Sequence, residues 1–259
     1  MRVASSLMPP SGVRPPGPFE ALGPATLDAA LGGGLALGRV HEIYGAEPDD
    51  AAAAIGFGMA LAGIVARDAA RPALWLRSRR AGQAGGVLQA QGWAELGGTP
   101  GPALLGLVPD GMALLRATVD ALRCPSLGVV VAEGWGNLRE LDLTASRRLT
   151  LAAEKSGVTL LLVRPDAAPA PSAAQTRWQV TSAPSRPLPG RAPGAPVFDL
   201  TLLRQKSGPC GLNWQLEWDR DRRIFREAPS SGALVSLPAD RPAAAGAGWQ
   251  RSPGGRSAA

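Results

Sequence analysis

Apolar and polar positions follow two alternating rhythms through the middle of the chain, which predict strands and helices in turn. Short continuous apolar runs predict strands at 39–44, 73–76, 104–108, 127–132 and 158–163. Between these runs, helices are expected at 49–66, 111–123 and 141–156. Runs such as 127–132 are typical of strands that are buried on both faces of a parallel sheet. This order predicts an α/β fold, in which a mostly parallel sheet is flanked by helices.

The rhythm changes after residue 165. A Pro-rich segment at 165–196 contains one candidate strand, TRWQVT, and period-two alternation then predicts a hairpin from 198–203 and 213–218 on the sheet edge. The chain is therefore expected to have three parts. These are a disordered Pro-rich arm at 1–18, one folded domain at 19–228 and a disordered tail at 229–259.

The composition is basic, with 27 Lys and Arg residues, a net charge of +6 and a pI near 10.5. Such a chain is attracted to nucleic acid or to acidic partners, although a codon bias toward arginine gives the same composition. Two cysteines are too few for a disulfide framework, and the start of the chain has no secretory signal. The longest apolar run, Ala51–Ala66, is too short to span a membrane. We therefore expect a soluble cytoplasmic protein that does not bind membranes.

A glycine-rich turn, a strand and a small-residue helix follow one another at 27–34, 38–45 and 49–66. A strand, a glycine, a short loop and a helix form the frame of a phosphate-binding loop, where backbone N–H groups hold phosphates. The segment LDAALGGGLALGRVHEIYGAEPDD resembles the start of the RecA recombinase core. The resemblance implies a RecA-like three-layer fold.

The residues that would act on a nucleotide are nevertheless missing from this loop. The pattern G-x-x-x-x-G-K-[ST] would begin at Gly45, which is present. Asp50 replaces the second glycine, and Ala51 replaces the lysine that reaches the phosphates. Ala52 replaces the hydroxyl that holds Mg²⁺, and Pro48 lacks an N–H donor. The loop is therefore a degenerate phosphate loop, and a RecA-type DNA-dependent ATPase is the alternative interpretation.

Carboxylates occupy this loop where a nucleotide would need cations. Asp49 is expected to cap the following helix and Asp50 to lie in its first turn, where the helix dipole favours negative charge. A phosphate would meet these groups and Glu47. It would also lack a lysine, whose attraction is about 4 kcal/mol near 4 Å at an effective dielectric of 20. We therefore expect no cofactor and no catalytic residues.

Arginines follow the predicted strand at 73–76, where the alignment to RecA places a catalytic glutamate. The C-terminal ends of parallel strands meet at one edge of the sheet. One arginine is therefore expected to pair with Glu47, Asp49 or Asp50 and to take the place of the nucleotide. The alternative is that these arginines are solvated on a loop. The candidates are Arg77, Arg79 and Arg80.

A second resemblance is narrower and covers about residues 20–227. The segments LDLTASRRLTLAAEKSGVTLLLVRP at 141–165 and SAAQTRWQVTSAPS at 172–185, together with the lysine-free loop, resemble the ImuA family of RecA-like bacterial proteins. The resemblance implies a non-catalytic accessory role in damage-induced (SOS) error-prone translesion DNA synthesis. It implies as partners an ImuB-like inactive Y-family polymerase and an error-prone C-family DNA polymerase, with RecA as a further candidate. A SulA-like inhibitor of cell division remains an alternative.

In RecA, a DNA-contacting loop follows the strand that matches 158–163. The equivalent stretch here holds Arg164 but few other cations, so only weak DNA binding is expected. Arg177 and Trp178 are the candidates for a stacking contact with a base. The alternative, which we favour, is that Trp178 packs on the sheet. His41 is the only histidine and has no cysteine nearby, so no metal site is expected.

Overall fold

A mixed sheet organises the part of the chain that the computed structural model describes, which is residues 18–67, 71–96 and 103–228. Within these residues the sheet has nine strands. Their order is β11 (Ile224–Glu227), β10 (Leu212–Asp219), β9 (Val197–Gln205), β8 (Thr176–Ala183), β3 (Val40–Gly45), β7 (Thr159–Arg164), β6 (Val129–Glu133), β4 (Ala73–Ser78) and β5 (Leu104–Val108). Most of the predicted arm at 1–18, and all of the predicted tail at 229–259, lie outside the described residues.

The sheet is parallel from β8 to β5 and antiparallel from β8 to β11. The central strand, β3, pairs in parallel with both β7 and β8. The mostly parallel sheet predicted from the sequence is thereby confirmed. The predicted hairpin is β9 and β10, but β11 rather than β10 forms the outer edge.

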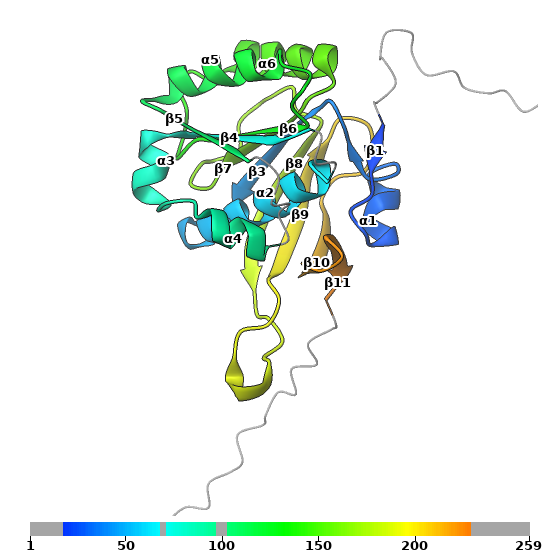
Figure 1. Cartoon of the computed structure of the whole chain (residues 1–259). Coiled ribbons are helices and arrows are strands. Elements are labelled where there is room, and N and C mark those ends of the chain that lie inside the picture. Colours follow the sequence, from blue (N-terminus) through cyan, green and yellow to red (C-terminus); the bar gives the residue numbers. More distant parts are fainter. Residues whose placement is uncertain (1–17, 68–70, 97–102, 229–259) are drawn as a thin grey trace, which may run out of the picture. The chain divides into compact units, whose positions relative to one another are not determined.

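Helices cover both faces of the sheet, as Figure 1 shows. On one face lie α2 (Ala51–Val65) and α4 (Ala90–Glu95), and on the other lie α5 (Gly111–Leu122) and α6 (Leu143–Ser156). The remaining elements are short: α1 (Ala25–Ala30), α3 (Arg79–Ala84), the 3-10 turns η1 (Pro48–Asp50) and η2 (Pro189–Arg191), and a small sheet of β1 (Phe19–Glu20) and β2 (Leu35–Ala36). The result is a three-layer arrangement.

The apolar helix α2 is the core helix of this arrangement. Among the described residues, one helical stretch, Pro48–Val65, is long and apolar enough to cross a membrane, but 61% of it is buried inside the fold. It lies very close to the sheet, because a Cβ added at Gly58 would come within 2.9 Å of a Val163 methyl group. Small residues therefore let α2 approach β3 and β7, and its apolar surface serves the core.

A buried series of hydrogen-bonded side chains lies beside this core and fixes the protonation state of His41. Trp178 Nε1 donates to Thr176 Oγ1 at 2.8 Å, and Thr176 Oγ1 lies 2.7 Å from His41 Nδ1. His41 Nε2 lies 2.8 Å from the carbonyl oxygen of Ala36. The carbonyl can only accept, so Nε2 carries the proton and Nδ1 accepts from the threonine hydroxyl. While His41 is neutral, each polar atom of the Trp178, Thr176 and His41 side chains has a hydrogen-bond partner.

We predict that His41 in the folded protein stays neutral well below pH 6.5, the ordinary pKa of a histidine. Burial lowers its pKa from 6.5 to about 4, the Ala36 hydrogen bond partly opposes this, and positive Arg39 adds to it. The unfolded chain therefore binds more protons between pH 6.5 and 4. Folding stability should be full above pH 6.5 and fall by up to about 3 kcal/mol as the pH drops through this window. Urea unfolding across pH 4.5–7.5 measures this loss.

The chain has one histidine, so NMR gives a clean second measurement. The ring proton signal of His41 should not shift between pH 7.5 and 5.5. In a His41→Gln variant, the loss of stability between pH 6.5 and 4 should shrink. A native-state titration with a midpoint near 6.5 would show that the ring is exposed to water and would contradict the structure.

Candidate functional site

The loop after β3 is held tightly between its two neighbouring strands. A Cβ added at Gly45 would lie 2.6 Å from the carbonyl oxygen of Pro165, so only glycine fits at this position. The next residue, Ala46, donates its backbone N–H to the carbonyl oxygen of Val180 at 3.0 Å. The degenerate phosphate loop is therefore hydrogen-bonded to β8 and packed closely against Pro165, which follows β7.

The side chain of Asp50 fills this loop. It is 6% exposed, and its Oδ2 accepts the backbone N–H of Glu47 at 3.3 Å. Its Oδ1 accepts the backbone N–H of Ser182 at 2.9 Å and the Ser182 hydroxyl at 3.2 Å. A carboxylate of the chain itself thus takes hydrogen bonds at the loop where a phosphate-binding protein would bind its ligand.

The helix begins later than the sequence suggested. Pro48 opens the short turn η1, because its fixed φ suits a first helical turn, and Asp50 N then donates to the Glu47 carbonyl oxygen at 3.0 Å. The capping position of α2 is Asp50, so the prediction that Asp49 caps the helix was wrong. Glu47, Pro48 and Asp49 are exposed, whereas Ala51 is buried at the start of α2. Ala52 is exposed and brings neither charge nor hydroxyl to the loop.

An ion pair joins the ends of β4 and β6 on the α2 side of the sheet. Arg77 Nη2 donates to Glu133 Oε1 at 2.7 Å, and Arg77 Nε donates to Glu133 Oε2 at 2.8 Å. Trp75 Nε1 adds a donor to Oε2 at 2.8 Å. Arg77 also donates to the carbonyl oxygens of Gly86 and Ala81, at 2.6 and 3.1 Å. Both partners are buried, with exposed side-chain fractions of 2% and 0%.

This pair corrects the proposed charge partners. Arg77 was expected to reach the acids of the loop after β3, but its carboxylate is Glu133 on the adjacent strand β6. Arg79 and Arg80 are exposed in the first turn of α3. Within the described part of the chain, neither makes an ion pair with Glu47, Asp49 or Asp50. The register of β4 against β6 places Arg77 opposite Glu133, and strand register could not be read from the sequence.

A second buried network lies on the α6 side of the sheet. Arg177 Nε donates to Glu42 Oε2 at 2.8 Å, and the Tyr44 hydroxyl donates to the same oxygen at 3.4 Å. Arg164 Nη1 donates to the Tyr44 hydroxyl at 2.9 Å, and its guanidinium stacks 5.2 Å from the centre of the ring. Burial, and then the charge of Glu42, raise the pKa of Tyr44 to about 12, although both arginines oppose the shift. The phenol therefore keeps its proton.

The side chain of Trp178 is not placed to stack on a base. Trp178 is fully buried, and its ring packs edge-on against Phe57 with centroids 6.0 Å apart. The interpretation that Trp178 packs on the sheet was the right one. Arg177 is 11% exposed and is also bound to Ser172 Oγ at 2.8 Å and to the Ala170 carbonyl oxygen. Arg164 is buried as well. All three side chains hold the sheet and its following loop together.

Sequence analysis missed Glu42 and Tyr44 as members of this network. The available signal was a charged and an aromatic residue, Glu42 and Tyr44, alternating with apolar ones on the strand predicted at 39–44. No group of three or more His, Cys, Asp or Glu side chains able to hold a metal occurs in residues 18–67, 71–96 or 103–228. The buried acids Asp50, Glu133 and Glu42 are already bonded to partners within the chain.

We predict that removing one member of the pair between Arg77 and Glu133 strongly destabilises the fold. An Arg77→Met substitution leaves a buried carboxylate without its partner and should lower the free energy of unfolding by about 3–5 kcal/mol. Replacing both residues, with Arg77→Met and Glu133→Leu, should restore most of this loss, because no unpaired charge remains. Urea unfolding at pH 7.5 measures both changes.

The matched control is an arginine in an exposed ion pair. Arg123 pairs with Asp120 at 3.2 Å, and both side chains are more than 70% exposed. Arg123→Ala should therefore change the free energy of unfolding by less than about 0.5 kcal/mol. An Arg77→Met variant as stable as this control would contradict the buried geometry.

Comparison with known proteins agrees with the architecture. The chain superposes on the crystal structure of the RadB recombinase with a TM-score of 0.52 and 15% identity, over 82% of this chain and 100% of that one. A likeness at this identity shows the fold, which is RecA-like as the sequence resemblance implied.

Sequence comparison is more specific. No protein-family model matches the chain. It is 31% identical over 256 residues to Protein ImuA of Caulobacter vibrioides strain NA1000 / CB15N, and the alignment covers 93% of this chain and 98% of that protein. Protein ImuA of a second strain, ATCC 19089 / CIP 103742 / CB 15, matches equally well. With this identity along nearly the whole of both chains, and with a RecA-like fold, the chain belongs to the ImuA family.

Proposed function

We propose that this protein is a non-catalytic accessory of damage-induced error-prone translesion DNA synthesis, which acts in the cytoplasm by recruiting or regulating a mutagenic polymerase assembly. One observation carries the proposal. The phosphate loop of a RecA-like fold is filled by the buried carboxylate of Asp50, which is bonded to Glu47 and Ser182. A RecA-like protein whose loop does not hold a nucleotide would act through the macromolecules that it binds.

The electrostatics of the loop support the absence of nucleotide turnover. A phosphate would have to displace Asp50 from the Glu47 N–H, or lie beside its negative charge. Two like charges 4 Å apart repel by about 4 kcal/mol at an effective dielectric of 20. Ala51 and Ala52 supply no cation and no hydroxyl to offset this repulsion. The loop therefore disfavours the ligand that its frame would otherwise attract.

The acid at the end of β6 supports the same conclusion. A Mg²⁺ ion bound with a nucleotide needs carboxylate oxygens that are free to coordinate it. Both oxygens of Glu133 accept hydrogen bonds from Arg77, and Trp75 shares one of them. Freeing the carboxylate would leave the buried Arg77 unpaired, which is costly. The Glu133 carboxylate is therefore not free to hold a metal ion.

Protein partners fit this chain better than DNA does. The arginines and the tryptophan proposed for DNA contact are bonded or buried within the fold. Membership in the ImuA family favours an ImuB-like inactive Y-family polymerase and an error-prone C-family polymerase as partners. RecA is a further candidate, and DNA is at most a weak ligand.

We predict that the protein does not bind ATP. Calorimetric titration with ATP and Mg²⁺ at millimolar concentration should release no heat of binding, because Asp50 occupies the loop. A RecA-type recombinase with an intact loop serves as the positive control under the same buffer conditions. Saturable binding of ATP, particularly if Asp50→Ala changes its affinity, would overturn the proposal and favour the ATPase interpretation.

We also predict selective capture of the polymerase assembly. When the protein is co-expressed with an ImuB-like protein and a C-family polymerase, a pull-down of the protein should recover both. One of the two is expected to bind the protein itself, and the other to bind the protein or the first partner. The division GTPase FtsZ, offered in parallel, should not be retained. Recovery of the division GTPase without the polymerases would instead support a SulA-like inhibitor.

A further inference from the structure

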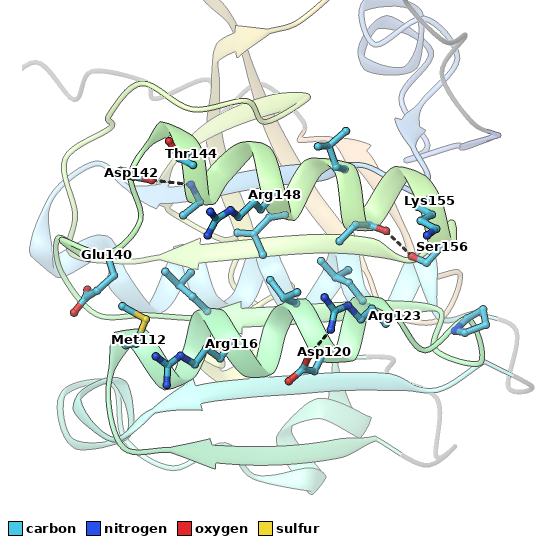
Figure 2. Close-up of a pocket in the computed structure, with 18 residues that line it drawn as sticks. Met112, Arg116, Asp120, Arg123, Glu140, Asp142, Thr144, Arg148, Lys155 and Ser156 are labelled. Atoms are coloured by element: carbon cyan, nitrogen blue, oxygen red, sulfur yellow. Dashed lines mark hydrogen bonds and ion pairs between the residues drawn. The ribbon is translucent and has the colours of Figure 1, made fainter.

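A groove lies between α5 and α6, on the face of the sheet opposite α2. Its volume is about 1360 Å³, and Figure 2 shows its lining side chains rising from both helices. Apolar side chains form much of the lining: Leu115, Val119, Leu122, Leu149 and Ala152. Met112 and Leu151 lie at its rim with 42% and 65% of their surface exposed. Leu115, Leu122 and Leu149 are at most 7% exposed, so Met112 and Leu151, with the partly buried Val119 and Ala152, supply the apolar surface that is open to a partner.

Two of the three acidic residues that line the groove, Asp142 and Asp120, are engaged within the chain. Asp142 caps α6 by accepting the Ala145 N–H at 2.7 Å. Asp120 pairs with Arg123 on the same helix at 3.2 Å. Glu140 lies beside the first residue of α5, since a Cβ added at Gly111 would come within 3.1 Å of its Oε2. The helix dipole favours a carboxylate at that position.

The remaining cations of the groove have no acidic partner. Arg116, Arg148 and Lys155 line it from both helices, as Figure 2 shows. Within the described ranges of the chain, none of the three has a carboxylate oxygen within 4.0 Å. Apolar surface bordered by unpaired cations is complementary to a segment with apolar residues on one face and carboxylates beside them.

The dimensions of the groove favour a helical occupant. The two bordering helices have 12 and 14 residues, which correspond to about 18 and 21 Å at 1.5 Å per residue. A third helix of similar length can lie along the groove and contact both. We propose that the groove between α5 and α6 docks an acidic amphipathic helix of a protein partner. The inference rests on the proposed function, because an accessory that recruits other proteins needs such a surface.

Charge argues against occupants from the chain itself. Residues 1–17 contain Arg2 and Arg14 and no acidic residue. Residues 229–259 contain three arginines and one aspartate, so each segment has a net charge of +2 from its side chains. A second copy docked face to face would bring the same unpaired cations together. These occupants are repelled by the three cations that attract an acidic helix.

A designed peptide tests the inference directly. The probe is a fluorescent helical peptide of about 14 residues, with leucines at i, i+3, i+4 and i+7 and glutamates at the flanking positions. Its partner probe has lysine at every glutamate position. Fluorescence anisotropy should give a dissociation constant on the order of 10 µM for the acidic probe, and at least tenfold weaker binding for the basic one.

Variants of the protein locate the binding site. Leu151→Glu and Arg148→Glu should each weaken the acidic probe at least tenfold. Leu188→Glu is the matched control, because Leu188 is 51% exposed but lies outside the groove, and it should leave binding unchanged. Circular dichroism establishes that each variant is folded.

Several outcomes would overturn the inference. These are equal binding of the two probes, no binding of either at 500 µM, or binding that Leu151→Glu does not weaken. Sedimentation that shows a dimer lost in Leu151→Glu would assign the groove to a second copy instead. If the probe fails to bind while the wild-type protein still captures the polymerases, the groove inference fails and the proposed function stands.

Discussion

A buried charge needs a partner, and this requirement governs the carboxyl edge of the sheet. Each buried carboxylate at or near this edge is satisfied by the chain itself: Glu133 by Arg77, Glu42 by Arg177, and Asp50 by Ser182 and the Glu47 backbone. In an open α/β sheet this edge is where ligands bind. Removing one member of a buried ion pair destabilises the fold more than replacing both members with apolar residues. The edge is therefore closed by internal interactions that a ligand would have to break.

The outer helices α5 and α6 border an open groove. The two electrostatic networks lie on opposite faces of the sheet, and both tie neighbouring strands together near β3, β6 and β7. They stiffen the scaffold that carries α5 and α6. The RecA-like sheet supports the two helices that border the groove. This fits an accessory protein of the ImuA family, whose proposed work is the assembly of other proteins.

Some parts of this structure could be predicted from local pattern. The parallel strands, the hairpin and the core helices follow from apolar runs and periodicity, which report burial directly. Loss of the loop's lysine could be read from the residues themselves. Other parts could not be predicted in this way. Arg77 was assigned the wrong acids and Asp49 the wrong cap, because pair formation depends on strand register and on where Pro48 starts the turn.

The sequence by itself determined the fold class, the family and the presence of Ala51 and Ala52 in place of a lysine and a hydroxyl residue, since these depend on residue identity and spacing along the chain. The tertiary structure decided which charges meet, which aromatic rings are buried, and where an open surface remains. Arg77 meets Glu133 although they are 56 positions apart, and Trp178 is buried only because β8 lies between β3 and β9. Contacts between distant residues are set by the packing of the whole domain, which no local pattern encodes.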